Sequence, residues 1–593
     1  VHQIPMVISV WDDEYGISVD NSFQTVKESI SEALAGFKRN KSKDGFEIFS
    51  VKGWDYPNLI HTFQKSGEIA RTNHVPVLIH VTELTQPQGH STSGSHERYK
   101  SDNRLKWEKE NDCNLKFRSW IIDNNIATEA ELEAIETSSK QEAKKAKENA
   151  WEASLEPIRN EAKQLTNCLS DAADEGLIKE GQRLLKDKSI NRKKIASFAR
   201  KSLRVLRKHP HSQTEKLQSW IANYFEETHP KFCGSLYNET KTSSLEVNKV
   251  EVSYDDEAPK VDGRIILRDN FKALFEKHDN ILAFGEDSGK MRDVNQGLEG
   301  LQSLFGAERV ADRGIREATI VGEGIGMALR GLRPIAEIQY LDYVLYALQI
   351  MSDDLATLHY RTNGKQVCPL IVRTRGHRLE GIWHSGSPMG SLVQNLRGMF
   401  VLVPRNMTQA AGMYNTLLEG NDPALVIESL NGYRLKESLP SNLGDFRVPL
   451  GVVETVRKGK DMTVVSYGST LRIVLEAADE LSSLGIDIEV IDVQSLTPFD
   501  LNHDIRKSIE KTNRVLIVDE DVPGGGTAYI LNELLEKQQI FPLLDSKPKT
   551  LSAKEHRPAY GSDGDYFSKP SLDDIIETVY EMMHEFDPRQ FPL

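Results

Sequence analysis

Residues 312–334 read DRGIREATIVGEGIGMALRGLRP, in which the end of a strand pattern passes through a turn into a helical pattern. A short apolar segment, ERVADRG (308–314), precedes Glu317, and a helical pattern rich in Gly and Ala follows it. Ligands of open α/β sheets bind at the carboxyl ends of strands, so a carboxylate here is a candidate cofactor contact, and small residues beside it let a ring approach closely. From the residues alone, a helix N-terminal carboxylate stabilised by the helix dipole is an equal alternative.

Strand-and-helix units of the same kind flank this stretch on both sides. From about 263 to 435 the short apolar segments include NILAFGED (280–287), RPIAEIQY (333–340), PLIVRTRG (369–376) and GMFVLVPRN (398–406). Another series begins near 447 with DMTVVSYGST (461–470), DIEVIDVQSL (487–496) and RVLIVDEDVPGGG (514–526). Because each strand is followed by a helix of ordinary length, both regions are predicted to be open, mostly parallel sheets. The Gly524–Gly526 run lacks P-loop and GxGxxG spacing, which favours a plain strand-to-helix turn.

The first 120 residues also alternate strand and helix patterns. VHQIPMVISV (1–10) is predicted to be a buried strand, PVLIHVTEL (76–84) a second strand, and SFQTVKESISEALAGF (22–37) a helix. This alternation indicates an α/β domain with a parallel sheet. A buried strand without a structural lead-in favours a chain that starts inside a domain, with a processed terminus as the alternative.

The next region has a different composition and a helical pattern without strands. Thr128 and Glu131 form a capping box ahead of a long, exposed helix rich in Ala, Glu and Lys. Between Lys186 and Lys208 there are ten Lys or Arg against the single Asp187. A surface for nucleic acid or an acidic partner is one interpretation, but an apolar stripe within the run favours a solvated helix face. The stripe comprises Ile190, Ile195, Phe198, Leu203 and Leu206. Residues 239–262 are polar and aperiodic, which indicates a linker.

Length and composition exclude several classes of protein. A chain of 593 residues is too long for one core, and three or four domains are expected. The formal net charge of −14 argues against nucleic acid as a partner. The four cysteines form no CxxC pair, which fits a reducing compartment and supports neither a disulfide framework nor a zinc site. No stretch approaches the roughly 18 to 20 apolar residues of a membrane helix, so a soluble intracellular protein is expected.

The segment around Glu317 resembles the β-subunit signature of thiamine-diphosphate-dependent 2-oxo acid dehydrogenases, in which the matching Glu protonates the aminopyrimidine ring. GEDSGKMRDVNQGLEGLQSLFG (285–306) is similar to the family segment that places Glu286 beside the cofactor. AEIQYLDY (336–343) resembles the segment whose last aromatic residue, Tyr343, packs on the pyrimidine. WHSGSP (383–388) resembles the family's active-site histidine motif, which assigns His384. Residues 491–500 and 514–528 are similar to the C-terminal domain shared with transketolases.

The N-terminal third resembles the α subunit of the same family. IPMVISVWDDEYGISV (4–19) is similar to the strand and loop that carry a metal-binding Asn, which assigns Asp13 and the backbone carbonyl of Tyr15 to Mg²⁺. GHSTSGSHERYK (89–100) resembles the α active-site loop, and His90 matches its catalytic histidine. The family's Gly-Asp-Gly segment would fall upstream of Val1, so the resemblance implies an incomplete diphosphate anchor and weak cofactor binding by the chain as given.

The resemblance implies an α/β thiamine-diphosphate-binding fold, with several open, mostly parallel sheets flanked by helices and a transketolase-like C-terminal domain. The expected regions are an α-type part (1–165), a helical, partly basic connector (166–262), a pyrimidine-binding domain (263–440) and the C-terminal domain (441–593).

The expected reaction is oxidative decarboxylation of a 2-oxo acid, branched-chain in preference to pyruvate, with acyl transfer to a lipoyl-bearing acyltransferase. A cytoplasmic homodimer equivalent to α₂β₂ is expected, with thiamine diphosphate and Mg²⁺ as cofactors and no nucleic-acid or membrane partner. The alternatives are a transketolase or deoxyxylulose-phosphate-synthase-like enzyme and an inactive, truncated assembly subunit. A Gly-Asp-Gly segment upstream in the gene would distinguish the enzyme from the assembly subunit.

Overall fold

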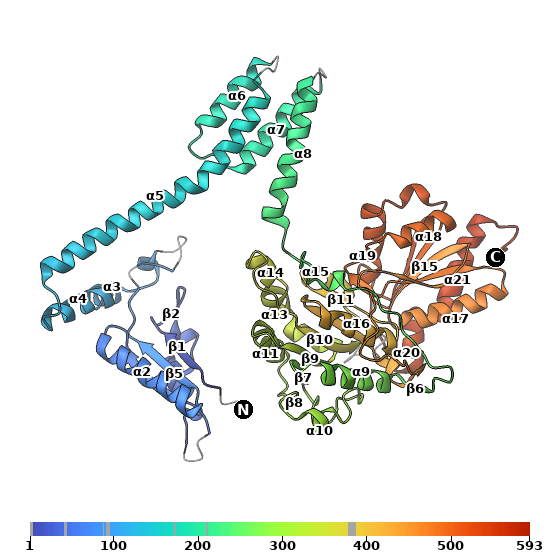
Figure 1. The fold of residues 1–593 in the computed structure, drawn as a ribbon, viewed down its shortest axis with the longest axis horizontal. Coiled ribbons are helices and arrows are strands. Elements are labelled where there is room, and N and C mark those ends of the chain that lie inside the picture. Colours follow the sequence, from blue (N-terminus) through green and yellow to red (C-terminus); the bar gives the residue numbers. More distant parts are fainter. Residues whose placement is uncertain are drawn as a thin grey trace. The chain divides into compact units, whose positions relative to one another are not determined.

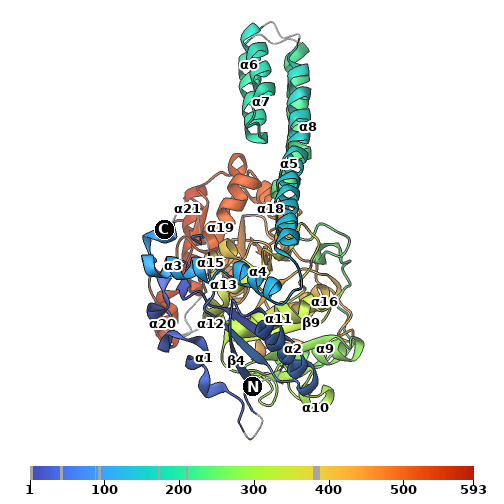
Figure 2. The ribbon, with the colours of Figure 1, turned by 90° about the vertical axis from the view of Figure 1, so that its left-hand side faces the viewer.

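The computed structural model describes residues 4–40, 44–86, 88–90, 95–170, 174–208, 212–377 and 387–593. The chain divides into two compact units, Val1–Ile221 and Ala222–Leu593, whose boundary falls inside helix α8 (Ser212–Cys233) (Figures 1 and 2). Each unit is described by itself.

The second unit contains a seven-stranded sheet with strand order β17-β11-β12-β10-β9-β7-β8. Strands β7 to β11 of this sheet are labelled in Figure 1. Its strands are β7 (Ile281–Gly285), β8 (Val310–Asp312), β9 (Arg333–Tyr340), β10 (Ile371–Gly376), β11 (Phe400–Leu402), β12 (Ala424–Ser429) and β17 (Ser495–Thr497). All neighbours pair in parallel except β17, which is antiparallel to β11. The carboxyl ends of β7, β8, β9, β10 and β12 therefore lie along one edge of the sheet, as the sequence patterns predict.

Helices cover both faces of this sheet and bury it. Helix α11 (Glu317–Leu329) packs on β9, and α16 (Met407–Glu419) packs on β12 and on α9 (Gly263–Lys277). Strand β12 is buried along its whole length, which is the pattern of a strand covered on both sides.

A five-stranded sheet of order β14-β16-β15-β18-β19 forms the C-terminal part. Its strands are β14 (Glu454–Arg457), β15 (Met462–Ser466), β16 (Ile488–Asp492), β18 (Val515–Val518) and β19 (Lys549–Leu551), and only β14 pairs antiparallel. The main helices beside it are α17 (Thr470–Ser483), α18 (Asp504–Thr512), α19 (Gly526–Asn532) and α21 (Leu572–Phe586). One hydrophobic cluster contains Ile338 and Leu392 of the first sheet region together with Ile517 and Ile530 of the second. The two sheets therefore share a core.

The first unit begins with a three-stranded parallel sheet of order β1-β5-β4, formed by β1 (Val7–Trp11), β5 (Val77–Thr82) and β4 (Glu47–Lys52). Helix α2 (Tyr56–Asn73) packs against all three strands. The expected strand in residues 1–10 exists over its described part, but the prediction that it is buried is wrong. β1 lies at the edge of the sheet, where Ile8 is 44% and Trp11 56% exposed.

The predicted helix over residues 22–37 is also wrong. This segment consists of 3-10 turns and the short helix α1 (Ile30–Ala33), and positive φ angles at Lys27 and Glu28 interrupt it. Phe23 and Val26 are 85% and 77% exposed, so the apolar stripe on which the prediction rested finds no packing surface. Without such packing a helix of this length is marginal.

The remaining helices of the first unit are α3 (Asp102–Glu110), α4 (Cys113–Asp123), α5 (Glu129–Cys168), α6 (Glu175–Lys186) and α7 (Arg192–Leu206). The Thr128–Glu131 capping box is present and begins the 40-residue helix α5. All five apolar residues of the basic run are buried, because α6 and α7 pack on each other and on α5 (Figure 2). The predicted solvated face with a packing stripe is therefore confirmed. The predicted linker 239–262 holds a 3-10 turn at Ser244–Glu246 and the short strand β6 (Lys260–Asp262).

Candidate active site

Three residues assigned from the sequence meet at the carboxyl edge of the seven-stranded sheet. Glu286 directly follows β7, Glu317 is the first residue of α11 after β8, and Tyr343 lies in α12 (Leu341–Val344) directly after β9. Strand β7 pairs with both β8 and β9, so the three connections are neighbours. The side chains of all three are partly exposed at this edge.

These three side chains also influence one another electrostatically. Burial, Asp287 and Glu317 together raise the pKa of the Glu286 carboxyl. Burial raises the pKa of the Tyr343 phenol, and the nearby carboxylates of Asp342, Glu286 and Glu317 add to the shift. A carboxyl in such a group holds its proton more tightly than in water. The arrangement suits a ring that offers basic nitrogens to a carboxyl and a flat face to an aromatic side chain, as an aminopyrimidine does.

The loop that carries Glu286 is fixed to both neighbouring strands. Asp287 accepts a hydrogen bond from Gln339 Nε2 at 3.0 Å, which ties the loop to β9. The carboxylate of Asp312, the last residue of β8, accepts the backbone N–H groups of Gly289 and Lys290 at 2.7 and 2.9 Å. Glu286 therefore lies on a short, braced turn.

A bidentate ion pair holds the turn before Glu317. Arg313 Nε and Nη2 donate to the two carboxylate oxygens of Glu323 at 2.7 and 2.6 Å, and the Arg313 backbone N–H donates to Gly285 O at 2.7 Å. The turn is thus attached to the end of β7 and to the body of α11, which sets the position at which α11 begins.

The small residues of α11 do not all serve the role expected from the sequence. A Cβ on Gly324 would come within 2.6 Å of Leu370, and one on Gly322 within 3.2 Å of Ile350, so these glycines let the helix pack closely on its neighbours. A Cβ on Gly326 would meet nothing within 4 Å. Close helix packing, and not room for a ring, explains the first two.

A buried charge network beneath this edge was missed from the sequence. Arg373 and Arg375 of β10 are fully buried and contact Asp293, Glu337 and Glu428. Burial opposes the charge of Asp293, but the two guanidiniums outweigh it and lower the pKa of that carboxyl. Two arginines inside the apolar segment PLIVRTRG are a signal for such a network, because a buried charge requires a partner.

In the first unit, the run Asp12–Glu14 follows β1 and its carboxylates have different contacts. Asp12 Oδ2 lies 2.8 Å from His80 Nε2, and Glu14 forms an ion pair with Arg104. Asp13 Oδ1 accepts the Tyr15 backbone N–H at 3.2 Å, and its other oxygen has no hydrogen-bond donor among the described residues. Asp13 is thus the acid of this run best able to take a cation.

The Tyr15 ring lies under positive charge, with Lys100 Nζ 5.0 Å and the Arg104 guanidinium 5.9 Å from its centroid. Both cations also bind the buried carboxylate of Glu108, at 2.7 and 2.8 Å. Among the described residues, no group of three or more His, Cys, Asp or Glu could hold a metal ion. The fit to Mg²⁺ is therefore limited to the Asp13 carboxylate and the Tyr15 carbonyl, and other oxygen ligands would have to complete the shell.

Of the two histidines assigned from the sequence, the structure describes His90 but not His384. His90 is exposed and follows β5 in the first unit, next to residues 91–94, which lie outside the described residues. His384 falls within 378–386, which also lie outside them. The roles of both histidines stay predictions.

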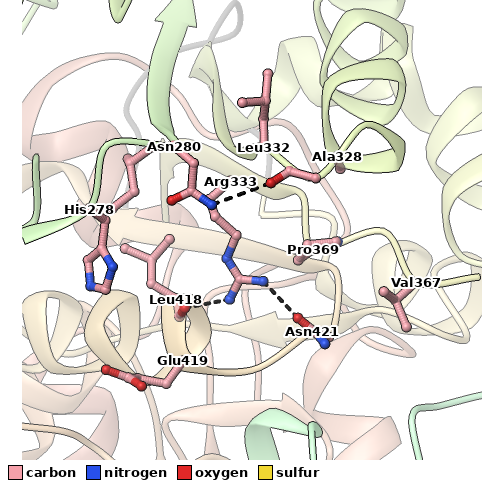
Figure 3. Close-up of a pocket in the computed structure, with 12 residues that line it drawn as sticks. His278, Asn280, Ala328, Leu332, Arg333, Val367, Pro369, Leu418, Glu419 and Asn421 are labelled. Atoms are coloured by element: carbon pink, nitrogen blue, oxygen red, sulfur yellow. Dashed lines mark hydrogen bonds between the residues drawn. The ribbon is translucent and has the colours of Figure 1, made fainter.

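The opposite, amino-terminal edge of the sheet has a pocket of about 380 Å³, lined by residues that include His278, Asn280 and Glu419 (Figure 3). Arg333 crosses it and donates to Asn421 Oδ1 at 2.8 Å and to carbonyl oxygens at the end of α16. Asn280 Nδ2 donates to Gly331 O at 3.3 Å. Arg333 thus caps the C-terminus of α16 by binding its last carbonyl oxygens. The pocket lies at the edge of the sheet opposite to Glu317.

Comparison with known proteins defines the class of fold. Residues 259–436 match the family described as transketolase, pyrimidine binding domain, and residues 451–568 match transketolase, C-terminal domain. The transketolase of Campylobacter jejuni aligns with a TM-score of 0.51 at 13% identity, over 97% of this chain and 72% of its own. The fold is thus the α/β thiamine-diphosphate-binding fold with a transketolase-like C-terminal domain, as the sequence predicts.

Residues 1–158 match the family described as dehydrogenase E1 component. The 2-oxoisovalerate dehydrogenase subunit beta of Bacillus subtilis is 31% identical over 286 residues, which are 48% of this chain and 86% of that protein. The pyruvate dehydrogenase E1 component subunit beta of the same organism is 32% identical over 265 residues, or 44% and 80%. The acetoin:2,6-dichlorophenolindophenol oxidoreductase subunit beta of Bacillus subtilis is 33% identical over 337 residues, which are 54% of this chain and 96% of that protein. The chain belongs to the thiamine-diphosphate-dependent 2-oxo acid dehydrogenase E1 components, a family of decarboxylating oxidoreductases.

Across the described ranges, no helix combines the length and the apolar character that crossing a bilayer requires.

Proposed function

We propose that this E1 component decarboxylates a branched-chain 2-oxo acid in preference to pyruvate and passes the acyl group to the lipoyl group of a partner acyltransferase. The observation that carries the proposal is the convergence of Glu286, Glu317 and Tyr343 at the carboxyl edge of the sheet. The relatives at 31% and 32% identity, a 2-oxoisovalerate and a pyruvate dehydrogenase subunit beta, support a 2-oxo acid as the substrate. The branched-chain preference rests on the sequence resemblance of the loop GHSTSGSHERYK (89–100). The bacterial relatives support a cytoplasmic location.

Each assigned residue then has a defined task. Glu317 holds a proton against a ring nitrogen of the pyrimidine, Glu286 lies beside it, and Tyr343 packs on the ring face. Thiamine diphosphate, when bound, would supply the electron sink that accepts the electron pair of the carbon–carbon bond broken when CO₂ leaves. Asp13 and the Tyr15 carbonyl would hold Mg²⁺ at the diphosphate.

The two histidines handle the substrate and the proton of the second half-reaction. We assign both His90 and His384 to binding the substrate carboxylate and to protonation of the departing lipoyl thiol, because an imidazole can donate and accept a proton as a general acid or base. Since α-type and β-type parts are joined in one chain, a homodimer takes the place of an α₂β₂ tetramer.

Steady-state decarboxylation tests this proposal directly. The full-length protein, supplied with thiamine diphosphate and Mg²⁺, is assayed with 2-oxoisovalerate, pyruvate, 2-oxoglutarate and acetoin, using dichlorophenolindophenol as oxidant. The expected order of kcat/KM places 2-oxoisovalerate first. A higher value for pyruvate or acetoin would overturn the substrate assignment, and ketol transfer between sugar phosphates without 2-oxo acid turnover would favour a transketolase.

A further inference from the structure

Three consecutive acids of the C-terminal domain, Asp519, Glu520 and Asp521, directly follow β18 and are buried. We call them the acid triplet. Each contacts the pyrimidine-binding domain at a different point. The sequence analysis treated this segment only as a strand followed by a turn, and neither the proposed mechanism nor the family resemblance uses these side chains.

Asp519 binds the residue that ends β10. Its Oδ1 lies 2.7 Å from Nε2 of His377, which has no exposed surface and directly follows Gly376. The backbone N–H of Ser469 donates to His377 Nδ1 at 2.9 Å. Because a backbone N–H can only donate, Nδ1 is the acceptor and the ring proton lies on Nε2, facing Asp519. The imidazole is therefore neutral and held in one tautomer.

The second oxygen of Asp519 accepts the Tyr467 hydroxyl at 2.5 Å. Burial and the neighbouring Asp519 hold the pKa of Tyr467 well above its usual value, so the phenol stays a donor. The Tyr467 ring stacks on His377, with centroids 5.0 Å apart. The carboxylate thus has a donor on each oxygen, and the imidazole is held both at its edge and on its face.

Glu520 and Asp521 bind the pyrimidine-binding domain again, just beyond residue 386. Ser387 Oγ donates to Glu520 Oε1, and the backbone N–H of Gly390 donates to Asp521 Oδ2 at 3.0 Å. Gly390 belongs to α15 (Met389–Asn395), and a Cβ at this position would come within 2.7 Å of Gly525 Cα. The two backbones can approach so closely only because both residues are glycines.

The acid triplet therefore attaches to both described ends of one stretch of chain. His377 stands before residues 378–386, Ser387 and Gly390 stand after them, and His384 belongs to this stretch by sequence. Residues 142 positions apart in the chain meet here, which ties the C-terminal domain to the active-site histidine motif.

We propose that Asp519, Glu520 and Asp521 are positioning residues, which hold His377 after β10 and Ser387 and Gly390 at the start of α15, and that these contacts are required for acyl transfer to the lipoyl group. This inference rests on the proposed function and uses only the thiol-protonating role given there to His384. A role of His384 in holding the substrate carboxylate would lower decarboxylation as much as acylation, and the test below distinguishes the two. Displacement of a catalytic group by about 1 Å is enough to cost on the order of 100-fold in rate, so loss of an attachment acts on turnover more than on substrate binding.

The test compares two activities of the full-length, cofactor-loaded protein. One is decarboxylation linked to dichlorophenolindophenol, and the other is reductive acylation of free lipoamide. In Asp519→Asn we expect kcat for reductive acylation to fall about 10- to 100-fold, with KM for the 2-oxo acid nearly unchanged and the pH profile of the acylation step displaced. Dye-linked decarboxylation should fall less. Equal loss of both activities, or no loss of either, would overturn the inference.

Two further variants separate positioning from general stability. Glu489→Gln is the matched control, because Glu489 is also a buried acid. Among the described residues its contacts, to Ser508, Lys511 and the backbone N–H of Gly459, lie within its own domain. It should leave the ratio of the two activities unchanged, and a changed ratio would contradict the proposal.

Ser387→Ala removes the side-chain contact to Glu520 and leaves Asp519 in place. If Asp519→Asn does not fold, this variant must show the selective loss on its own.

A double-mutant cycle tests whether Asp519 and His377 act as one unit. The variant Asp519→Asn/His377→Gln should be no slower in reductive acylation than the worse of its single variants, and fully additive losses would count against coupling. A wild-type protein without 2-oxo acid turnover would refute the proposed function itself. An active wild type with unaffected variants would refute the positioning role alone.

Discussion

Arg373 Nε donates to Glu428 Oε1 over 2.8 Å, and neither side chain is exposed to solvent. The same guanidinium reaches Asp293 and Glu337, so one cation joins β9, β10, β12 and the loop after Glu286. We predict that Arg373→Met lowers the free energy of unfolding by about 3–5 kcal/mol, because buried carboxylates lose their partner where no water replaces it. Urea denaturation followed by circular dichroism measures the change.

Arg472→Met provides the control for this prediction. Arg472 pairs with Glu476 on the exposed face of α17 at 2.9 Å, an i,i+4 contact open to water. Its loss should change the free energy of unfolding by less than about 1 kcal/mol. A similar cost for both variants would mean that the buried network contributes no more than a surface pair.

The second prediction concerns Glu317, the first residue of α11. Glu317→Gln should lower decarboxylation by at least about 100-fold while the thermal midpoint stays close to that of the wild type, because Gln keeps the shape but cannot carry the proton. Dye-linked turnover and differential scanning calorimetry give the two measurements. Glu276→Gln, an exposed acid on α9, should leave both unchanged. Near-normal turnover of Glu317→Gln would remove this residue from the active site.

The third prediction separates the two histidines from the carboxylates. His90→Ala and His384→Ala should each strongly depress overall activity with a lipoyl acceptor, because both are assigned to substrate binding and thiol protonation. Rapid-mixing measurement of reductive acylation tests each variant. Undiminished rates in both would show that the two motifs have been assigned to the wrong chemistry.

Local signals in the sequence predicted most of the elements that build this site. The apolar segments ending at Gly285 and Tyr340 become buried parallel strands, and the Thr128–Glu131 capping box begins a helix where expected. These predictions succeed because periodicity, caps and turn residues act over a few positions. The helix expected over residues 22–37 fails because its apolar stripe needed a packing surface that only the tertiary structure decides.

Contacts between distant segments could not be predicted in this way. His377 and Asp519 each follow an ordinary apolar strand, and neither segment's sequence indicates that the two residues form a contact. The two arginines of PLIVRTRG indicate buried partners but not which acids supply them. The edge position of β1 depends likewise on strand order, which a strand's own sequence does not carry.

The last prediction concerns Asp492, the final residue of β16, which is fully buried. Its Oδ2 accepts from Arg405 Nη1 at 2.8 Å, yet burial outweighs this contact and raises the pKa of the carboxyl from 3.8 to about 6. The folded state therefore binds this proton more tightly than the unfolded chain. The resulting stabilisation is fully present below pH 3.8 and is lost as the pH rises through 6.

Asp492→Asn removes this titration while keeping an oxygen for Arg405. From pH 4 to pH 7 the wild type should therefore lose about 2 kcal/mol of its free energy of unfolding relative to the variant, since one pKa unit corresponds to about 1.4 kcal/mol and the unfolded chain is already largely ionised at pH 4. Urea denaturation of both proteins at matched pH values measures it, and the comparison cancels all other titrating groups that the substitution leaves alone. A difference that stays constant from pH 4 to pH 7 would show that Arg405 keeps Asp492 ionised in the fold, so that ion pairing and not burial decides its protonation.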